Sequence, residues 1–354
     1  MNAQQTAPKV TKETKNKIRV EFDRTSSWKR FKIKYLSMNF LMQVVFVIFR
    51  FVLLVGISYV ILFPFFSKIS SSFMGREDFV DVTVKLIPKY PTLDTYKAII
   101  TDNFYFQAMF NTIILSLSCA LIQTFICTVI GYGFAKFKFK GSNLLFFLVI
   151  FTMVVPHETL QLSMFMKFRY FDIFGIFGLL GGEGIFGLFE GMAILPFSSL
   201  NLNNSYWPLY ILSVGGLAFK NGLYIFMMRQ FFRGVPDELE ESAYIDGSGV
   251  FRTFVQIILP LSVPMMITIF LFAFSWQWTD DFYTTVFFTT EGLKLMPDVV
   301  AVPKSLDTNY AGQNLYVAAI RNTCGLMIIA PLIILYLFCQ RYLIQGIERS
   351  GITG

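Results

Sequence analysis

The sequence has few of the side chains that most enzymes use for catalysis or metal binding. Among its 354 residues there is one histidine, His157, and there are four cysteines, all of which lie inside apolar runs. A single histidine has no second imidazole with which to share a metal ion. Cysteines in apolar runs are expected to pack as small hydrophobic side chains. The composition therefore predicts neither a metal site nor a disulfide framework.

Motifs for nucleotide binding and metal-dependent hydrolysis are also missing. The sequence has no G-x-x-x-x-G-K-[ST] and no H-E-x-x-H, and its one G-x-G-x-x-G match, GEGIFG at 182–187, lies in an apolar stretch without a preceding strand. We therefore expect the chain to bind no nucleotide itself. A membrane hydrolase would need a nucleophile and a base at membrane depth, and the sequence offers no convincing pair.

Charge is scarce, and long apolar runs take its place. Charged residues make up 15% of the chain and hydrophobic residues 55%, with 42 phenylalanines, which is typical of a polytopic membrane protein. A helix needs about 20 mostly apolar residues to cross a hydrocarbon layer about 30 Å thick. We expect spans near Phe46–Ile69, Thr112–Ala135, Asn143–Met166, Tyr206–Met228, Val255–Trp278 and Asn314–Gln340. The sequence thus predicts an all-α membrane protein with six transmembrane helices.

A further apolar stretch, FDIFGIFGLLGGEGIFGLFEGMAILPF at 171–197, is harder to interpret. It is broken by seven glycines and two glutamates. We favour re-entrant or surface-lying helical pieces within an extended external loop at 167–205, and a seventh span is the alternative.

Positive charge is concentrated near the N-terminus. Residues 1–43 contain ten Lys and Arg against three acids, and the short loop KFKFKG after the second run adds three lysines. Because Lys and Arg accumulate in cytoplasmic loops, both segments are expected to be cytoplasmic. Six spans then place both termini inside: a basic tail at 1–43, a transmembrane domain at 44–346 and a short tail at 347–354. The stretch WKRFKIKYL at 28–36 suits the anionic headgroups of a lipid bilayer, which we favour over nucleic acid.

An acid-rich segment, VPDELEESAYIDGSGV at 235–250, is unusual in so apolar a chain. Pro236 suits the first turn of a helix, Asp237 suits its positive end, and Gly247 suits the position just past its C-terminus. The segment predicts one short helix near 237–245 and a second that continues into the fifth span. Acids are poor ligands for anionic lipid, so a protein partner is favoured over a loop lying on the membrane.

The same segment resembles the EAA coupling loop of ABC importer permeases. The pattern E-A-A, then D-G, then a spaced L-P is present as Glu241-Ser242-Ala243, Asp246-Gly247 and Leu259-Pro260. Further matches to the carbohydrate-uptake type, in the order the family has them, are YPTLDTYKAI, FNTIILS, YGFAKFKFKG, YIFMMRQFFRGVP and CQRYLIQGI. The chain departs from the family at Ser242, usually alanine, and at Ser350 and Thr353, where glycine and lysine are usual.

This resemblance implies a type I ABC importer permease fold and a transport subunit rather than an enzyme. The chain would form half of a translocation pathway for a sugar or oligosaccharide, beside a second, different permease subunit. Two cytoplasmic ATPase subunits would bind ATP and Mg²⁺, and an extracellular or periplasmic sugar-binding protein would deliver the substrate. This chain would bind no cofactor.

The resemblance also assigns residues that contact the ATPase. In the family the coupling loop, which corresponds here to 235–260, sits in a cleft of the ATPase and its EAA glutamate pairs with a basic residue, a role that falls on Glu241. The coupling residues implied are Glu240, Glu241, Ser242, Ala243, Asp246, Gly247, Leu259 and Pro260. The C-terminal tail of this subunit type reaches toward the ATPase, which corresponds here to Arg349, Ser350, Gly351 and Thr353.

Polar residues at membrane depth are costly and therefore mark the candidate substrate pathway. Lys220 and Asn221 lie well inside the fourth expected span. The stretch FSWQWTDDF at 274–282 resembles the tryptophan-centred motif of the family, and its candidate sugar-contacting residues are Trp276, Trp278, Asp280 and Asp281. Two alternatives stay open: an interfacial aromatic belt with hydrated acids, and a buried ion pair between Lys220 and Glu158.

Two other function classes remain at this stage. A secondary transporter would use inverted repeats and broken helices rather than an ATPase. A structural membrane subunit would need no pathway at all. The two halves of the sequence show no evident repeat, which favours the importer, but nothing in the sequence identifies the sugar, its length or its charge.

Overall fold

A computed structural model describes Trp28 and residues 38–173, 175–180, 199–289, 292–309 and 313–351. The chain divides into two compact units, Met1–Ser67 and Lys68–Gly354. Within the described residues the structure is helical, with two isolated β-bridges, Met74 to Pro91 and Phe171 to Leu200.

The first unit is represented by most of helix α3 (Met38–Ser71). Nearly all its side chains from Met42 to Phe66 are exposed, and nearly all are apolar. A helix so long and apolar is suited to lipid, because its backbone polar groups are hydrogen-bonded within the helix. The first expected span is confirmed as a helix of spanning length.

Three further spans are confirmed as helices of sufficient length and hydrophobicity in the second unit. They are α5 (Tyr105–Lys136), the continuous run of α12 (Val250–Thr253), η3 (Phe254–Ile258) and α13 (Leu259–Trp278), and α15 (Gln313–Gly351). The segment η3 is a π-helical turn, and Pro260, which has no N–H to donate, follows it in the first turn of α13.

The third expected span, Asn143–Met166, is wrong as one continuous helix. α6 (Ser142–Val154) ends before Pro156, and the chain resumes at η2 (His157–Leu160) and α7 (Gln161–Arg169) after a bend of 94°. Proline cannot donate to the preceding turn and forces the residue before it out of the helical region, and Val155 is accordingly extended at ψ 120°.

The fourth expected span, Tyr206–Met228, is also divided. α9 (Trp207–Val214) and α10 (Asn221–Arg233) are separated by residues 215–220. Gly216 and Lys220 both adopt the left-handed conformation there, with φ of 69° and 66°. The described residues therefore contain four helices long and apolar enough to span a membrane, or five if the bent α6–α7 pair is one span.

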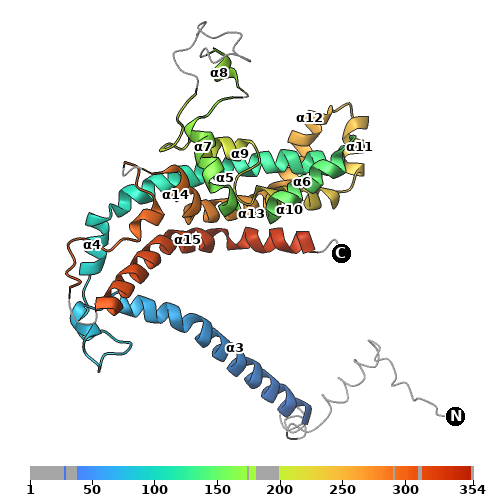
Figure 1. The fold of residues 1–354 in the computed structure, drawn as a ribbon. Coiled ribbons are helices and arrows are strands. Elements are labelled where there is room, and N and C mark those ends of the chain that lie inside the picture. The colour runs from blue at the N-terminus through green and yellow to red at the C-terminus, as the bar shows by residue number, and fades with distance from the viewer. Residues whose placement is uncertain are drawn as a thin grey trace, which may run out of the picture. The chain divides into compact units, whose positions relative to one another are not determined.

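Helix α5 is the central element of the second unit. It packs most extensively against α10 and α13, and also against α9 (Figure 1). Gly131 of α5 allows the closest approach, because a Cβ at that position would lie 2.5 Å from the Cβ of Met228 on α10. In Figure 1 the short helix α11 (Glu238–Ile245) lies with α12 at one end of this unit and α4 (Asp94–Asp102) at the other.

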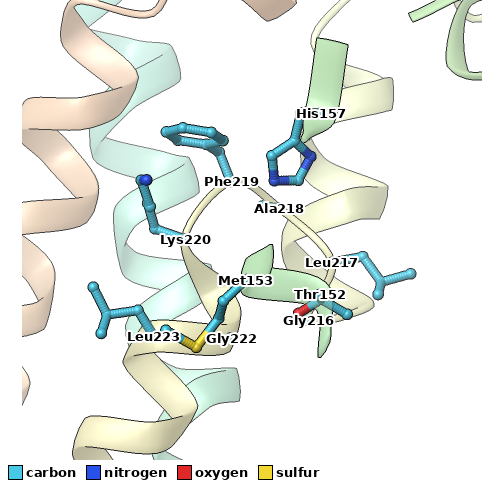
Figure 2. Close-up of a pocket in the computed structure, with 10 residues that line it drawn as sticks. All are labelled: Thr152, Met153, His157, Gly216, Leu217, Ala218, Phe219, Lys220, Gly222 and Leu223. Atoms are coloured by element: carbon cyan, nitrogen blue, oxygen red, sulfur yellow. The ribbon is translucent and has the colours of Figure 1, made fainter. Parts of the chain in front are cut away.

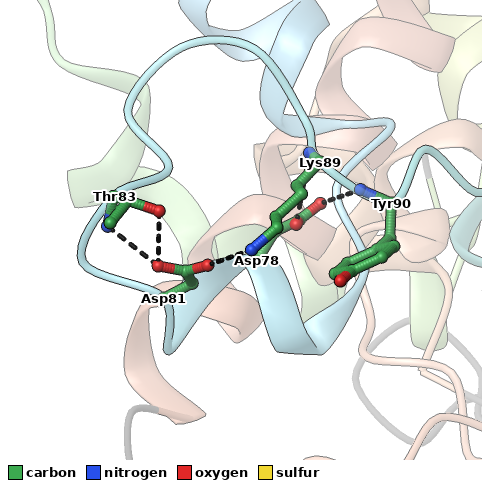
Figure 3. A network of polar contacts seen from close by, with 5 residues as sticks. All are labelled: Asp78, Asp81, Thr83, Lys89 and Tyr90. Atoms are coloured by element: carbon green, nitrogen blue, oxygen red, sulfur yellow. Dashed lines mark hydrogen bonds and ion pairs between the residues drawn. The ribbon is translucent and has the colours of Figure 1, made fainter.

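The end of the unit near α4 carries a loop built on polar contacts. It includes η1 (Arg76–Phe79). Other short helices of the unit are α14 (Phe282–Phe287), which contacts α7, and η4 (Met296–Val299), which contacts α5. Asp81 accepts hydrogen bonds from the Thr83 backbone and hydroxyl and from the Lys89 ammonium, 3.1 Å away (Figure 3). These bonds lower the pKa of the partly exposed Asp81 carboxyl to about 2, the Thr83 hydroxyl contributing most.

The glycine-rich stretch at 171–197 is described only in part. Helix α8 (Ile176–Leu180) begins it, with the Asp172 carboxylate accepting from the backbone N–H groups of Phe177 and Gly178. Residues 181–198, on which the choice between surface pieces and a seventh span depends, lie outside the described residues. Most of the basic tail at 1–43 lies outside them as well.

Candidate functional site

The two broken helices meet at a cavity of about 120 Å³. One wall comes from the α6–η2 break and the other from the turn between α9 and α10, as Figure 2 shows. Its lining residues are Thr152, Met153, His157, Gly216, Leu217, Ala218, Phe219, Lys220, Gly222 and Leu223. Breaks in helices expose backbone and position side chains that a continuous helix would hold elsewhere, so this cavity is the first candidate site.

Lys220 does not lie inside a helix, as the sequence suggested, but immediately before α10 in the left-handed conformation. Its ammonium lies 4.5 Å from the centre of the Phe219 ring and 5.0 Å from that of Trp276, within the range of cation–π attraction. The ion pairs among the described side chains do not include Lys220, so the pair with Glu158 considered above is not formed.

His157 and Tyr283 extend the aromatic group around Phe219. The His157 and Phe219 ring centres are 5.0 Å apart, and Figure 2 shows Phe219 between His157 and Lys220. The Tyr283 hydroxyl lies 3.5 Å from Nδ1 of His157. The sequence predicted no metal site at His157 and did not single out Phe219 or Tyr283. Pro156 and the paired glycines at 215–216 are the features of the sequence that could have indicated this region.

Asp280 lies beside this group. It lines a small void of about 10 Å³ with Gln123, Phe219, Ala273, Trp276, Gln277 and Tyr283. Its Oδ1 accepts from the Tyr283 backbone N–H at 3.4 Å, and its buried Oδ2 has no hydrogen-bond partner within the described part of the chain. An unpartnered buried carboxylate oxygen is costly and is therefore a candidate acceptor for a substrate hydroxyl.

The remaining residues singled out from the sequence lie elsewhere. Trp278 is buried against α15 and its Nε1 donates to the Ile328 carbonyl at 2.9 Å, which is a packing role. Asn221 is fully buried and does not line the cavity. Asp281 is exposed beside Thr279 at a separate cavity of about 350 Å³. The structure thus brings Lys220, Trp276 and Asp280 together and separates the other three from them.

The second candidate site is the surface of α11 and its neighbour α12. Glu241 and Ser242 are exposed, while Glu240 and Ala243 turn inward and are buried. Gly247 is left-handed just past the helix end, at φ 83°, as expected for a C-terminal glycine, and Asp246 beside it is exposed. Leu259 and Pro260 begin α13 and do not belong to the α11 surface.

Two large apolar side chains add to this surface. Ile245 on α11 is 86% exposed and Phe251 on α12 is 80% exposed. Apolar side chains beside exposed acids are typical of a protein docking surface rather than of a solvated loop. In the C-terminal segment, the backbone of Arg349, Ser350 and Gly351 continues α15, and Thr353 lies outside the described residues.

Lys136, the last residue of α5, holds the acidic segment in place. Its side chain is only 6% exposed, and its ammonium donates to the Val235 carbonyl at 2.7 Å and to the Asp237 carboxylate. The hydrogen bond from Lys136, and then its charge, lower the pKa of the Asp237 carboxyl. Asp237 therefore stays ionised at neutral pH, and the contribution of the pair to stability is lost only as the pH falls through that lowered pKa.

We expect Lys136→Met to loosen the acidic segment without unfolding the helices. The substitution removes the hydrogen bond from the nearly buried Lys136 ammonium to the Val235 carbonyl, which is worth about 1–2 kcal/mol. The exposed Asp237 carboxylate adds little to this, because water screens its charge. Limited proteolysis should cut residues 246–249 faster in this variant. Lys140→Met, which removes an exposed lysine from the same loop, is the control, and equal cutting in both variants would contradict the anchoring role.

Comparison with known proteins adds three findings. The model of a family described as "Binding-protein-dependent transport system inner membrane component" matches residues 127–349. The maltodextrin transport system permease protein MalD of Streptococcus pneumoniae (strain ATCC BAA-255 / R6) is 30% identical, over 85% of this chain and 93% of its own length. The arabinooligosaccharides transport system permease protein AraQ of Bacillus subtilis (strain 168) is 27% identical, over 84% of this chain and 92% of its own length.

A solved structure has the same fold. It is the crystal structure of a bacterial ABC transporter involved in the import of the acidic polysaccharide alginate, and one of its chains superposes with a TM-score of 0.60. The match covers 84% of this chain and 96% of that chain at 21% sequence identity, so it shows a similarity of fold alone.

Proposed function

Because the chain belongs to the family of binding-protein-dependent transport system inner membrane components, and resembles its carbohydrate ABC permeases, we propose that it is a permease subunit of an ATP-driven importer of sugars or oligosaccharides. The observation that carries this proposal is the α11 surface. A short acidic helix, with exposed Glu241 and Ile245, is attached through Lys136 to the end of the central helix α5.

This arrangement suits mechanical coupling. A partner that moves α11 would transmit the movement to α5 through Lys136, and α5 packs directly on α10 and α13. Rigid-body coupling of this kind needs a bistable interface and no chemistry in the permease. We assign ATP and Mg²⁺ to two ATPase subunits, one of which docks on Glu241 and the apolar side chains beside it, and we assign Glu240 and Ala243 to packing within the permease.

The proposed topology keeps six membrane-spanning segments, two of them broken. α3, α5, α13 and α15 cross as continuous helices, while the α6–α7 and α9–α10 pairs cross as interrupted ones. Six segments put both termini on the same side of the membrane as the basic loop at 136–140, which is the cytoplasmic side. α11 lies on that side as well, because it meets this loop at the Lys136–Asp237 contact. The opposite end of the second unit would face the binding protein, and a second, different permease would complete the pathway beside Lys220, Trp276 and Asp280.

Interrupted helices are also typical of secondary transporters, which makes that class the alternative. Affinity purification of this chain from its own membrane distinguishes the two. We expect an ATPase subunit and a second permease to copurify with it, and uptake in proteoliposomes to require ATP and the binding protein. A chain that purifies alone and transports on an ion gradient would overturn the proposal.

A further inference from the structure

We propose that the cavity at the two helix breaks takes the carboxylate of an acidic sugar, with Lys220 as its counter-ion. This inference rests on the proposed function as a sugar permease and adds the charge of the substrate. The class of ligand is an oligosaccharide that contains uronic acid units, whose sugar rings each carry one carboxylate.

The ammonium of Lys220 is held by aromatic rings. It lies over the faces of Phe219 and Trp276, and the ion pairs of the described side chains do not include it. Aromatic faces attract a cation but do not neutralise it, so a carboxylate entering the cavity gains a charge-assisted hydrogen bond. A neutral sugar would displace water from the ammonium and leave its charge uncompensated.

The backbone at Lys220 supports a functional role. A non-glycine residue at φ 66° is strained, and such strain persists where the surrounding structure fixes a side chain for a purpose. Glycine or asparagine in place of Lys220 would adopt the left-handed conformation with less strain. Lysine at this position places a cation directly beside the cavity.

The size of the cavity and its surroundings indicate how much of a sugar enters. A volume of about 120 Å³ is several times the roughly 10–15 Å³ of cavity volume that one water needs, enough for a carboxyl group and the carbon that bears it. The rest of the ring would lie on Trp276, whose side chain is 48% exposed and whose indole face suits the C–H groups of a sugar. His157, on the far side of Phe219 from Lys220, adds a nitrogen-bearing ring to the lining.

Asp280 is the acid to reconcile with this assignment. It lines the adjacent void rather than the cavity, and no ion pair joins it to Lys220. Its unpartnered Oδ2 suits a sugar hydroxyl and would repel a carboxylate. The two side chains therefore orient a uronate unit in one direction, with its carboxylate toward Lys220 and a hydroxyl toward Asp280.

The test compares matched ligands on the assembled complex. Trigalacturonate and trimannuronate are each titrated by calorimetry into the purified complex in nanodiscs, beside their methyl esters, which keep the ring and remove the charge. We expect at least one free acid to bind about ten-fold or more tightly than its ester, as for a charge-assisted hydrogen bond. In Lys220→Met the free acid should bind no better than the ester, and Lys220→Arg should restore part of the difference.

The outcomes separate this inference from the proposed function. Copurification of the ATPase tests the function before any ligand is added. In a complex that assembles, equal binding of acids and esters to the unaltered protein overturns the inference, even if Lys220→Met proves unstable. Equal weakening of acid and ester by Lys220→Met also overturns it, because Lys220 would then hold the protein or the second permease rather than the carboxylate.

Discussion

We expect Glu241→Lys to detach the ATPase and abolish uptake while the permease remains folded. Glu241 is exposed on α11, so the reversal disturbs no internal contact, but it replaces attraction with repulsion at the proposed interface. Recovery of the ATPase with the tagged permease should fall about ten-fold or more, and ATP-driven uptake with it. Glu241→Gln, which removes the attraction without adding repulsion, should show an intermediate loss.

Two controls make this result specific. The second permease should still copurify with Glu241→Lys, which shows that the chain is inserted and assembled. Glu77→Lys makes the same change of charge at an exposed position in η1, at the other end of the second unit, and should leave ATPase recovery unchanged. Full ATPase recovery with Glu241→Lys would remove α11 as the coupling element.

Gly131→Ala should have the largest effect on stability. The added Cβ would lie 2.5 Å from the Cβ of Met228 and 3.1 Å from the backbone nitrogen of Arg229, so helices α5 and α10 must move apart. Forced overpacking of this kind costs about 1–3 kcal/mol. We expect a lower melting temperature for the detergent-solubilised complex and a smaller yield of monodisperse protein.

Gly133 on the same helix provides the matched control. A Cβ there meets nothing within 4 Å, so Gly133→Ala adds only the helix preference of alanine, a gain of up to about 1 kcal/mol. The two alanine variants should therefore shift the melting temperature in opposite directions. Equal melting of both would mean that α5 and α10 are not in close contact at Gly131.

The identity of the fold was largely predictable from local sequence. Four of the expected spans follow from the length of the apolar runs, because lipid forces a helix on any segment of that length. The bounds of α11 were predicted nearly to the residue, since Pro236, Asp237 and Gly247 each act on the helix ends within one turn. The family resemblance, carried by the motif from Glu241 to Pro260, is confirmed by the match over residues 127–349.

The breaks in the third and fourth expected spans were not predicted from the local sequence. Pro156 and the glycines at 215–216 are visible in the sequence, but hydropathy averages over them and so predicted continuous spans. Proline and glycine are tolerated inside membrane helices where neighbouring elements satisfy the freed backbone groups, so their presence alone does not decide whether a span breaks.

By itself the sequence determined that the chain is helical, membrane-embedded and related to sugar permeases, because composition, run length and motif spacing are properties of neighbouring residues. Only the tertiary structure decided which polar residues share a site. Trp276 and Trp278 look equivalent in the sequence, yet residues two positions apart on a helix face nearly opposite sides. Trp276 therefore reaches Lys220, and Trp278 packs on α15. Lys136 and Asp237 are 101 residues apart, and their contact exists because the packing of α5 on α10 brings their ends together.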